Sequence, residues 1–425
     1  MTIFWRINSI IMKAVVVGGG IIGLCSAYYL QQSGWEVTVL DRDDLSDNCS
    51  FGNAGMIVPS HFTPLASPGI IAQGIRWMFD SKSPFYVRPA LSLPLAKWGL
   101  QFIRHANQKN VEQGAPYLRD LSLLSYHLYQ ELANQPGFQF AFEQKGILMY
   151  FKTARTEDEE SHLAVKARSL GLDAELISPD QIKVLEPGLQ MDILGAVHYR
   201  CDAHLYPPAL MQQLMKTFIK KGGRIRTHCP ITHIQTQNSQ IKKLSTDKED
   251  FHADLFVLSA GAWMSTLAKM AGISIPLMPG KGYSITEKNP AFKLNIPAIL
   301  CEARVAITPM NGYMRYGGTM EIASVNNRIH RKRVEGIIES IPKYFPNLSL
   351  KMPDTKDIWF GFRPCSPDGL PYIGFSRKLK NLIFAGGHSM MGLGLGPATG
   401  RVVSDLANGH PLPVGIDAFN PERFS

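Results

Sequence analysis

The sequence predicts an α/β fold in which a discontinuous Rossmann-like domain is interleaved with an α+β domain built on a mainly antiparallel sheet. A glycine-rich turn follows the first β-branched segment, and the strand-and-helix pattern expected after that turn stops at residue 41. Glycine turns between a strand and a helix return near residues 260 and 390. A chain of 425 residues, 45% hydrophobic and 19% charged, is long enough for two such domains.

The first section of the Rossmann-like domain lies at the beginning of the chain. Residues 13–17 are expected to form a strand, residues 21–33 a helix, and residues 36–40 a second strand that ends at Asp41. Gly34 stops the helix. This order of elements is the context in which a glycine fingerprint binds a dinucleotide.

The glycines between this strand and helix have the G-x-G-x-x-G spacing. Gly18 permits the tight turn, Gly20 lets the backbone approach a pyrophosphate, and Gly23 lets the helix pack closely on the strand. The helix N-terminus offers free N–H groups to the phosphates, and Asp41 can accept hydrogen bonds from a ribose. The fingerprint predicts a dinucleotide but does not decide between NAD and FAD.

The uncharged loop from Ser50 to Met56 favours FAD. A plain NAD dehydrogenase would continue with alternating strands and helices, whereas small residues dominate this loop and suit a backbone that lies against a flat ring. An ordinary surface connection is the alternative interpretation.

A second section of the same domain is expected between residues 207 and 263. A helix with apolar residues from Leu210 to Phe218 is followed by strands at residues 224–236, 240–245 and 255–259. The last of these strands runs into Ala260 and Gly261. The order resembles the return of one cofactor domain after an insertion.

The third section is the C-terminal part of the chain. A strand at residues 381–385 precedes a glycine-rich turn, and a helix is expected at residues 398–408. The positive end of that helix would stabilise negative charge on a reduced flavin. His388 in the turn could be a base, but a histidine packed beside the ring is favoured because hydride removal by a flavin does not require a base.

The segment from Trp359 to Gly374 carries the most specific motif. It resembles the R-P-x-x-x-D-G-x-P-x-I-G signature of bacterial D-amino acid dehydrogenases and glycine oxidases. The fragments Lys281–Ser284 and Gly317–Glu321 look like substrate-domain strands of the same group. From Met12 to about Ala407, the chain therefore resembles the D-amino acid oxidase superfamily of FAD-dependent enzymes.

The resemblance implies which residues surround FAD. It also implies a cofactor held without a covalent bond, because Gly361 stands about where sarcosine oxidases have the cysteine that attaches the flavin. The implied cofactor-binding residues are Gly18, Gly20, Ile21, Ile22, Gly23, Asp41, Arg42, Asn53, Ala54, Gly55, Met56, Ile231, Ala260, Gly261, Trp263, Gly387, His388, Met391, Gly392, Leu393, Gly394 and Thr399.

Arg363 matches the arginine that holds the substrate carboxylate in this family. A planar guanidinium binds a carboxylate through two parallel charge-assisted hydrogen bonds. The alternative is that Arg363 pairs with Asp368 in a structural turn. The other expected substrate-binding residues are Met320, Tyr283, Ala306 and Met390.

Two of these residues depart from the glycine oxidase pattern. Met390 replaces an arginine and Ala306 replaces a tyrosine, so a larger and more apolar substrate than glycine or sarcosine is favoured. The expected reaction is oxidative deamination of a D-amino acid, of the D-proline or hydroxy-D-proline type, by hydride transfer from Cα to flavin N5. It gives an imino acid and then a keto acid or cyclic imine. The electron acceptor is expected to be a quinone or another carrier.

Two alternative functions are an oxygen-using amine oxidase of the glycine or sarcosine type and a flavoprotein domain that modifies tRNA. A net charge of +9 mildly favours the second, but the sequence has no basic and aromatic groove signal, so no nucleic-acid partner is expected. The densest basic group, Arg328, Arg331, Lys332 and Arg333, is predicted to lie on one solvated helical face.

The expected domains are residues 12–60, 201–271 and 355–425 for FAD and residues 61–200 and 272–354 for substrate.

Six scattered cysteines without a C-x-x-C pair indicate neither a disulfide framework nor a metal site and suggest a cytoplasmic protein. Residues 1–11 are too weakly apolar for a signal peptide or a membrane span. Peripheral contact with the inner face of a membrane is an alternative to core packing for Trp77, Met78, Trp98 and Leu100. The oligomeric state is not predicted.

Overall fold

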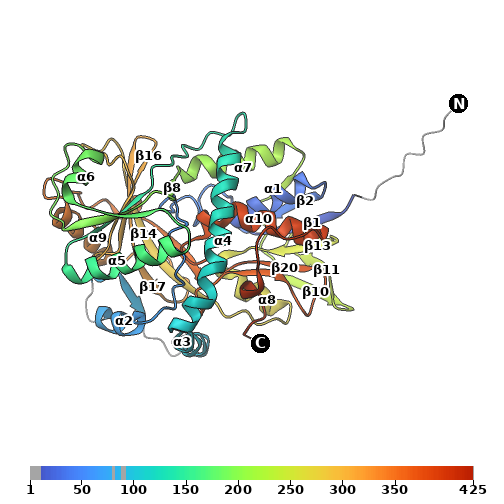
Figure 1. Cartoon of the computed structure of the whole chain (residues 1–425). Coiled ribbons are helices and arrows are strands. Elements are labelled where there is room, and N and C mark those ends of the chain that lie inside the picture. Colours follow the sequence, from blue (N-terminus) through green and yellow to red (C-terminus); the bar gives the residue numbers. More distant parts are fainter. Residues whose placement is uncertain (1–10, 79–81, 88–91, 425) are drawn as a thin grey trace.

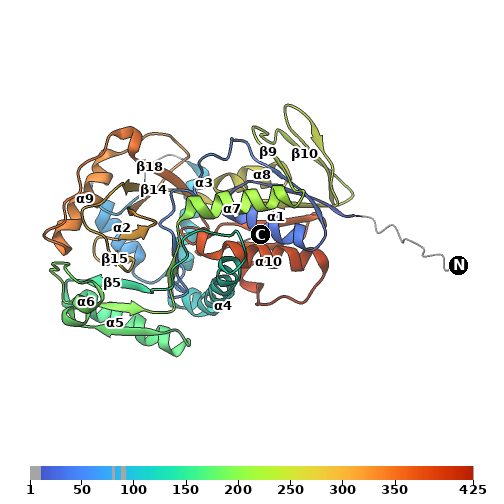
Figure 2. The ribbon, with the colours of Figure 1, turned by 90° about the horizontal axis from the view of Figure 1, so that it is seen from above.

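The computed structural model describes residues 11–78, 82–87 and 92–424. Residues 1–10, which include most of the N-terminal segment discussed above, lie outside the described part. The chain forms two halves, each with its own large sheet, and helix α4 (Gln108–Ala133) runs between them (Figure 1). Seen from above, α1 (Ile21–Gln32), α7 (Pro207–Lys220) and α10 (Gly392–Asn408) lie in one half, and α5 (Ala154–Ser169), α6 (Pro179–Leu185) and α9 (Arg331–Tyr344) lie in the other (Figure 2).

The first half contains a six-stranded sheet made from three distant parts of the chain. Its strand order is β19 (Tyr372–Phe375), β20 (Leu382–Gly386), β13 (Leu255–Leu258), β1 (Lys13–Val17), β2 (Glu36–Leu40) and β9 (Arg224–Arg226). All neighbours are parallel except β19 and β20. The prediction of a discontinuous Rossmann-like sheet is confirmed. The single strand expected at 224–236 was wrong, because β9 ends early and β10 (His233–Gln237) joins a separate sheet with β11 (Gln240–Ser245) and β12 (Asp250–Phe251).

Helices α1 and α10 cover this sheet and pack closely on each other. A Cβ on Gly400 would lie 2.5 Å from the backbone carbon of Cys25, and one on Gly396 would lie 2.7 Å from the side chain of Ile21. Glycine at these two positions therefore permits the close approach of the helices. Helix α10 also begins six residues earlier than its predicted start at residue 398, because Pro397 falls within the helix rather than before it.

Helix α4 begins after Asn107, whose side chain caps it by accepting a hydrogen bond from the N–H of Asn110 at 3.0 Å. The apolar stripe of α4 is buried in one core with α1 and α10, and its members are Leu118, Leu121, Leu128, Tyr129 and Leu132. The Tyr129 hydroxyl donates to the carbonyl of Leu393 at 2.6 Å. This packing ties α4 to the first half, although the sequence placed it in the substrate domain.

The second half contains a nine-stranded, mainly antiparallel sheet. Its order is β18 (Trp359–Cys365), β14 (Met278–Glu287), β17 (Tyr313–Ile322), β16 (Val305–Met310), β15 (Ala298–Leu300), β5 (Ile147–Phe151), β7 (Gly195–Tyr199) and β6 (Ala174–Ile177), with β4 (Phe85–Val87) beside β17. Among the described strand pairs of this sheet, only β15–β5 and β17–β4 are parallel. Strand β18 belongs to this sheet, although the sequence assigned residues 355–425 to the cofactor domain. The pairing favours a domain limit after Cys365.

The two faces of β14 have different neighbours. Tyr283 and Ile285 are buried in a core with Val334, Ile337 and Ile341 of α9. On the other face, the Ser284 hydroxyl donates to the carbonyl of Gly52 at 3.1 Å. The second face of β14 is therefore directed toward the first half of the molecule.

Helix α9 also corrects one charge prediction. Arg333 is 5% exposed, donates to the carbonyl of Ser83 at 2.6 Å and stacks over the ring of Tyr86 at 4.7 Å. Arg331 and Lys332 are exposed as expected. The remaining elements are β3 (Met56–Ile57), which pairs with β8 (Ala203–His204), α2 (Ile70–Met78), α3 (Leu93–His105) and α8 (Met264–Met270).

Candidate active site

The first glycine turn has no room for side chains at two of its positions. Gly18 has φ +106°, and a Cβ there would lie 2.6 Å from the carbonyl oxygen of Ser259. A Cβ on Gly23 would lie 1.8 Å from the carbonyl oxygen of Gly18. Asp41 accepts a hydrogen bond from the N–H of Gly19 at 2.7 Å, which fixes its carboxylate at the end of β2. These contacts explain why the turn needs glycine.

Two other glycines face open space instead. A Cβ on Gly20 would have only the Ser50 hydroxyl as a neighbour, at 3.6 Å, and a Cβ on Gly261 would meet no described atom within 4 Å. Helix α1 has Gly20 at its N-cap, which offers no capping side chain, and it has no acid in its first turn; the Ser50 hydroxyl accepts from the N–H of Ile21 at 3.0 Å. A helix N-terminus without an acid or an N-cap side chain, beside open backbone, suits the phosphates of a dinucleotide.

The first section contacts both of the other sections. A Cβ on Gly18 would lie 3.0 Å from the Cα of Ala260, which joins the first section to the second. A Cβ on Gly394 would lie 3.7 Å from the carbonyl oxygen of Met56, which joins the first section to the third. Helix α10, like α1, begins without a side-chain cap and without an acid in its first turn.

The loop before β3 is held in a fixed conformation. Gly55 has φ +75°, and its carbonyl accepts from the N–H of Leu205 at 2.8 Å. The Asn53 side chain accepts from the N–H of Gly55 at 2.9 Å. Ala54 and Met56 pack in one apolar cluster with Ala306 of β16.

Two residues that the sequence assigns to the cofactor site, from different sections of the chain, contact each other. The guanidinium of Arg42 stacks over the ring of Trp263, with 3.7 Å between its central carbon and the ring centre. Ile231 is partly buried and packs against the hydrophobic core that contains Val15, Val17 and Leu40 of the six-stranded sheet. The structure thus brings Arg42 and Trp263 together.

His388 is buried in the third turn, where the adjacent Gly387 has φ +74°. Its Nε2 lies 2.9 Å from the Thr399 hydroxyl, and its Nδ1 has no partner among the described residues. Burial lowers the pKa of His388 to about 3, so the ring is neutral at physiological pH. The unpartnered Nδ1 is available to a bound cofactor.

Strand β18 contacts all three sections at once. The N–H of Phe362 donates to the sulfur of Cys49 at 3.1 Å, and the Phe362 ring meets the ring of Trp263 edge-on, with centres 5.9 Å apart. The N–H of Ser389 donates to the carbonyl of Pro364 at 3.0 Å. The strand that carries Arg363 therefore lies where the three sections converge.

Arg363 has a cationic side chain without an acidic partner. No Asp or Glu oxygen of the described residues lies within 4.0 Å of its nitrogens, while Nη1 donates to the carbonyl of Thr319 at 2.5 Å. Burial lowers the pKa of Arg363 below its ordinary value. A partly buried guanidinium without a counter-ion is a strong site for an incoming carboxylate.

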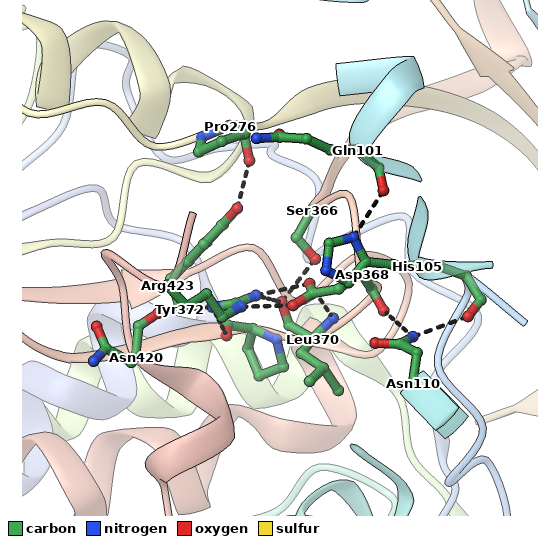
Figure 3. Close-up of polar contacts among 12 residues, drawn as sticks. Gln101, His105, Asn110, Pro276, Ser366, Asp368, Leu370, Tyr372, Asn420 and Arg423 are labelled. Atoms are coloured by element: carbon green, nitrogen blue, oxygen red, sulfur yellow. Dashed lines mark hydrogen bonds and ion pairs between the residues drawn. The ribbon is translucent and has the colours of Figure 1, made fainter. Parts of the chain in front are cut away.

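Asp368, the alternative partner of Arg363, is bound elsewhere. Arg423 reaches its two carboxylate oxygens from Nε at 2.6 Å and from Nη2 at 2.8 Å (Figure 3). The Arg423 guanidinium also stacks over the ring of Tyr372 at 4.2 Å. The motif's arginine and aspartate thus have separate roles, and Arg363 stays free of Asp368.

The structure separates the other expected substrate residues. Met320 is buried and adjoins the Thr319 carbonyl to which Arg363 donates, while Met390 is 48% exposed in the third turn. Tyr283 does not reach Arg363, because it lies on the α9 face of β14 and its hydroxyl accepts from the N–H of His330 at 3.2 Å. A direct substrate contact for Tyr283 is therefore not supported.

Sequence reasoning missed residues that shape this site. Gly282 leaves space for the Arg363 guanidinium, and Ser284 and Arg315 bind carbonyls of the loop before β3. The alternation of Gly280, Gly282 and Ser284 on one strand face was the available signal. Arg315 had no recognisable signal, because only the fold brings β17 to that loop.

Comparisons with known proteins agree with this geometry. The family described as FAD dependent oxidoreductase matches residues 13–406. The chain belongs to this family. The protein is therefore an FAD-dependent oxidoreductase. The open glycines, the N-termini of α1 and α10, which have no acid and no cap from their N-cap residues, and the unpartnered Nδ1 of His388 fit that cofactor.

Curated relatives of this family member cover nearly its whole length. The D-amino acid dehydrogenase of Vibrio vulnificus (strain CMCP6) is 30% identical over 422 residues, 96% of this chain and 99% of that protein. The D-amino acid dehydrogenase of Helicobacter pylori (strain ATCC 700392 / 26695) is 28% identical over 396 residues, 93% of this chain and 94% of that protein.

Solved structures share the fold. Glycine oxidase from Geobacillus kaustophilus matches with a TM-score of 0.76 at 21% identity, covering 97% of this chain and 99% of that one. L-proline dehydrogenase from P. horikoshii matches with a TM-score of 0.74 at 19% identity, covering 97% of this chain and 98% of that one.

Proposed function

We propose that this FAD-dependent oxidoreductase deaminates a D-amino acid oxidatively. The observation that carries the proposal is Arg363, a partly buried guanidinium without an acidic partner among the described residues, on a strand that touches all three sections of the cofactor site. Two relatives of nearly the same length are named D-amino acid dehydrogenase. A carboxylate bound to Arg363 would orient the neighbouring Cα–H bond.

FAD, when bound, supplies the acceptor for the hydride that leaves Cα. Arg363 binds the carboxylate, and the Thr319 carbonyl fixes one end of the guanidinium. The substrate amine loses one proton to solvent before or during oxidation. The Cα loses a hydride, which carries two electrons and one hydrogen nucleus. Hydrolysis of the imino acid then yields a keto acid and ammonia, or a cyclic imine remains when the substrate is proline-like. Because Gly361 has no nucleophilic side chain, we infer that FAD is held without a covalent bond at that position.

The substrate side chain is proposed to be apolar. Met320 and Ala306 offer no charge or hydroxyl group, and Met390 replaces the arginine expected for a glycine oxidase. Met320 belongs to a buried apolar cluster with Trp98, Met278, Ile322 and Cys365. D-proline and hydroxy-D-proline types are the first candidates, with glycine and sarcosine weaker substrates.

Anaerobic bleaching of the flavin with D- and L-amino acids tests this function. Some D-amino acid should bleach the wild-type flavin, and Arg363→Leu should lower kcat/KM at least tenfold, since a charge-assisted hydrogen bond contributes about 1.5–3 kcal/mol. Arg155→Leu, which removes an exposed arginine on α5, is the charge-matched control. The carboxamide of the best substrate should be poor for the wild type and equally poor for Arg363→Leu. Unchanged kinetics in Arg363→Leu would remove the proposed role.

The proposed electron acceptor is a quinone or another carrier rather than oxygen. The names of the curated relatives support a dehydrogenase, whereas glycine oxidase among the solved structures supports only the fold. Stopped-flow reoxidation with a soluble quinone should be at least tenfold faster than with air-saturated buffer. The reverse order would favour the oxidase.

We propose that the protein is cytoplasmic and that helix α3 contacts the membrane surface peripherally. Leu93, Leu100 and Ile103 are 68%, 52% and 57% exposed, and Lys97 and Arg104 are exposed beside them. Trp98 does not take part, because it is buried and donates to the carbonyl of Cys365 at 2.9 Å. The side chain of Met78 lies outside the described residues.

Vesicle binding tests this contact. In the described part of the chain, no helix combines the length and apolarity needed to span a bilayer. Co-sedimentation with anionic vesicles should exceed that with zwitterionic ones, and Leu100→Glu with Ile103→Glu should abolish it. Equal recovery with both vesicle types, or no effect of the substitutions, would contradict the contact.

A further inference from the structure

The loop before β3 is bound by side chains from the opposite sheet through its carbonyl groups. Nη1 of Arg315 donates to the carbonyls of Phe51 at 2.8 Å and Asn53 at 2.7 Å. The Ser284 hydroxyl donates to the carbonyl between them, that of Gly52, at 3.1 Å. Three successive carbonyls of this loop are thus held by β14 and β17.

Arg315 is itself fixed and buried. It is 6% exposed, and its Nε donates to the Thr286 hydroxyl at 3.0 Å. Burial lowers its pKa to about 10, so the guanidinium remains positively charged at neutral pH. Within the described ranges, no Asp or Glu oxygen lies within 4.0 Å of its nitrogens.

A buried charge of this kind is costly unless something compensates it. Hydrogen bonds to carbonyl dipoles offset part of the desolvation penalty, but a neutral side chain could donate to the same carbonyls at a lower cost. The positive field of Arg315 acts on the adjacent loop Asn53–Met56, where FAD is expected. A neighbouring positive charge favours the two-electron reduction of a flavin, which increases negative charge on the ring.

We propose that Arg315 is a positioning residue of the FAD site, which fixes the loop from Phe51 to Asn53 and raises the reduction potential of bound FAD. Ser284 helps to fix the loop but does not raise the reduction potential, because its side chain is neutral. The inference rests on the FAD dependence of the family and not on the identity of the substrate. A failure of the proposed deamination would therefore not contradict this inference, and a failure of this inference would not contradict the deamination.

FAD binding to apoprotein and the flavin midpoint potential test the two effects without substrate. Arg315→Met should weaken FAD binding at least tenfold and lower the midpoint potential. Ser284→Ala should weaken binding by a smaller factor and leave the potential unchanged. Arg315→Lys should restore most of the potential but not the full affinity, because an ammonium cannot bind the two carbonyls and also supply the separate Nε–H that donates to Thr286.

Arg155→Met on the exposed face of α5 controls for the loss of one positive charge. The proposal is overturned if folded Arg315→Met binds FAD within twofold of wild type, or if its potential equals that of Arg155→Met. If Arg315→Met does not fold, the FAD affinities of Arg315→Lys and Ser284→Ala are used as the test instead. FAD affinity within twofold of wild type in both would then overturn the proposal, and weaker binding in both would support it.

Discussion

The guanidinium of Arg363 occupies the space that a side chain on Gly282 would need. A Cβ on Gly282 would lie 2.3 Å from both Nη1 and Nη2 of Arg363 and 2.4 Å from its central carbon. The two residues lie on neighbouring antiparallel strands, β14 and β18. The orientation of the expected carboxylate clamp therefore depends on the absence of a side chain on the adjacent strand.

Gly282→Ala should impair substrate binding while leaving the cofactor in place. The added methyl group displaces the guanidinium, so KM for the amino acid should rise at least tenfold, with an unchanged flavin absorption spectrum. Gly99→Ala on α3 is the control, because a Cβ there meets no described atom within 4 Å. Steady-state kinetics with the best D-amino acid measure the effect. A wild-type KM in Gly282→Ala would show that the clamp does not require this space.

The two kinds of glycine in the first turn should respond differently to substitution. Gly20→Val should fold as apoprotein, because its φ of −71° suits any residue and its Cβ has room, yet FAD should bind at least a hundredfold more weakly. Gly23→Val should destabilise the apoprotein by more than about 3 kcal/mol, since its Cβ collides with the Gly18 carbonyl. Thermal unfolding and FAD titration distinguish the two outcomes. Equal effects on folding would contradict this division.

His204 should make the protein less stable in acid. Burial lowers the pKa of His204 from 6.5 to about 4, against the opposing effect of the Glu143 carboxylate 3.9 Å from Nε2, and neither ring nitrogen has a hydrogen-bond partner among the described residues. The unfolded state therefore binds more protons than the folded state between these pH values. The contribution of His204 to the unfolding free energy is complete above pH 6.5 and decreases by up to about 1.4 kcal/mol per pH unit as pH falls toward 4.

Replacing His204 should remove this dependence. His204→Leu should gain about 2 kcal/mol over wild type between pH 7 and pH 5, as measured by urea unfolding. His233→Leu, at an exposed strand position, should keep the wild-type slope. Parallel pH profiles for His204→Leu and wild type would rule out this source of acid sensitivity.

The Asp368–Arg423 pair should be important for stability. Both side chains are largely buried, at 5% and 14% exposure, so Arg423→Met leaves an uncompensated carboxylate and should cost about 3–5 kcal/mol. The double variant Asp368→Asn, Arg423→Met should recover much of the loss. Lys183→Met removes the exposed pair with Asp180 and should cost less than about 1 kcal/mol. A similarly small cost for Arg423→Met would mean that the buried pair contributes little.

Much of the fold was predictable because its signals are local. Strands β1 and β2 and helix α1 follow from β-branched runs and glycine stops within a short stretch of chain. The start of α10 was mispredicted because Gly392 and Gly396 disfavour a helix locally, whereas close packing on Ile21 of α1 requires a small residue at position 396. Tertiary packing overrode the local preference.

The sequence by itself determined the cofactor class, the position of Arg363 in its motif and the presence of two interleaved domains, because each depends on residue type and spacing. Only the tertiary structure decided that Asp368 pairs with Arg423, that Tyr283 faces away from Arg363, and that Arg315 binds the loop before β3. The physical reason is that a strand's residue pattern does not reveal which partner lies over each face. Charge pairing and side-chain direction are settled when distant segments come together.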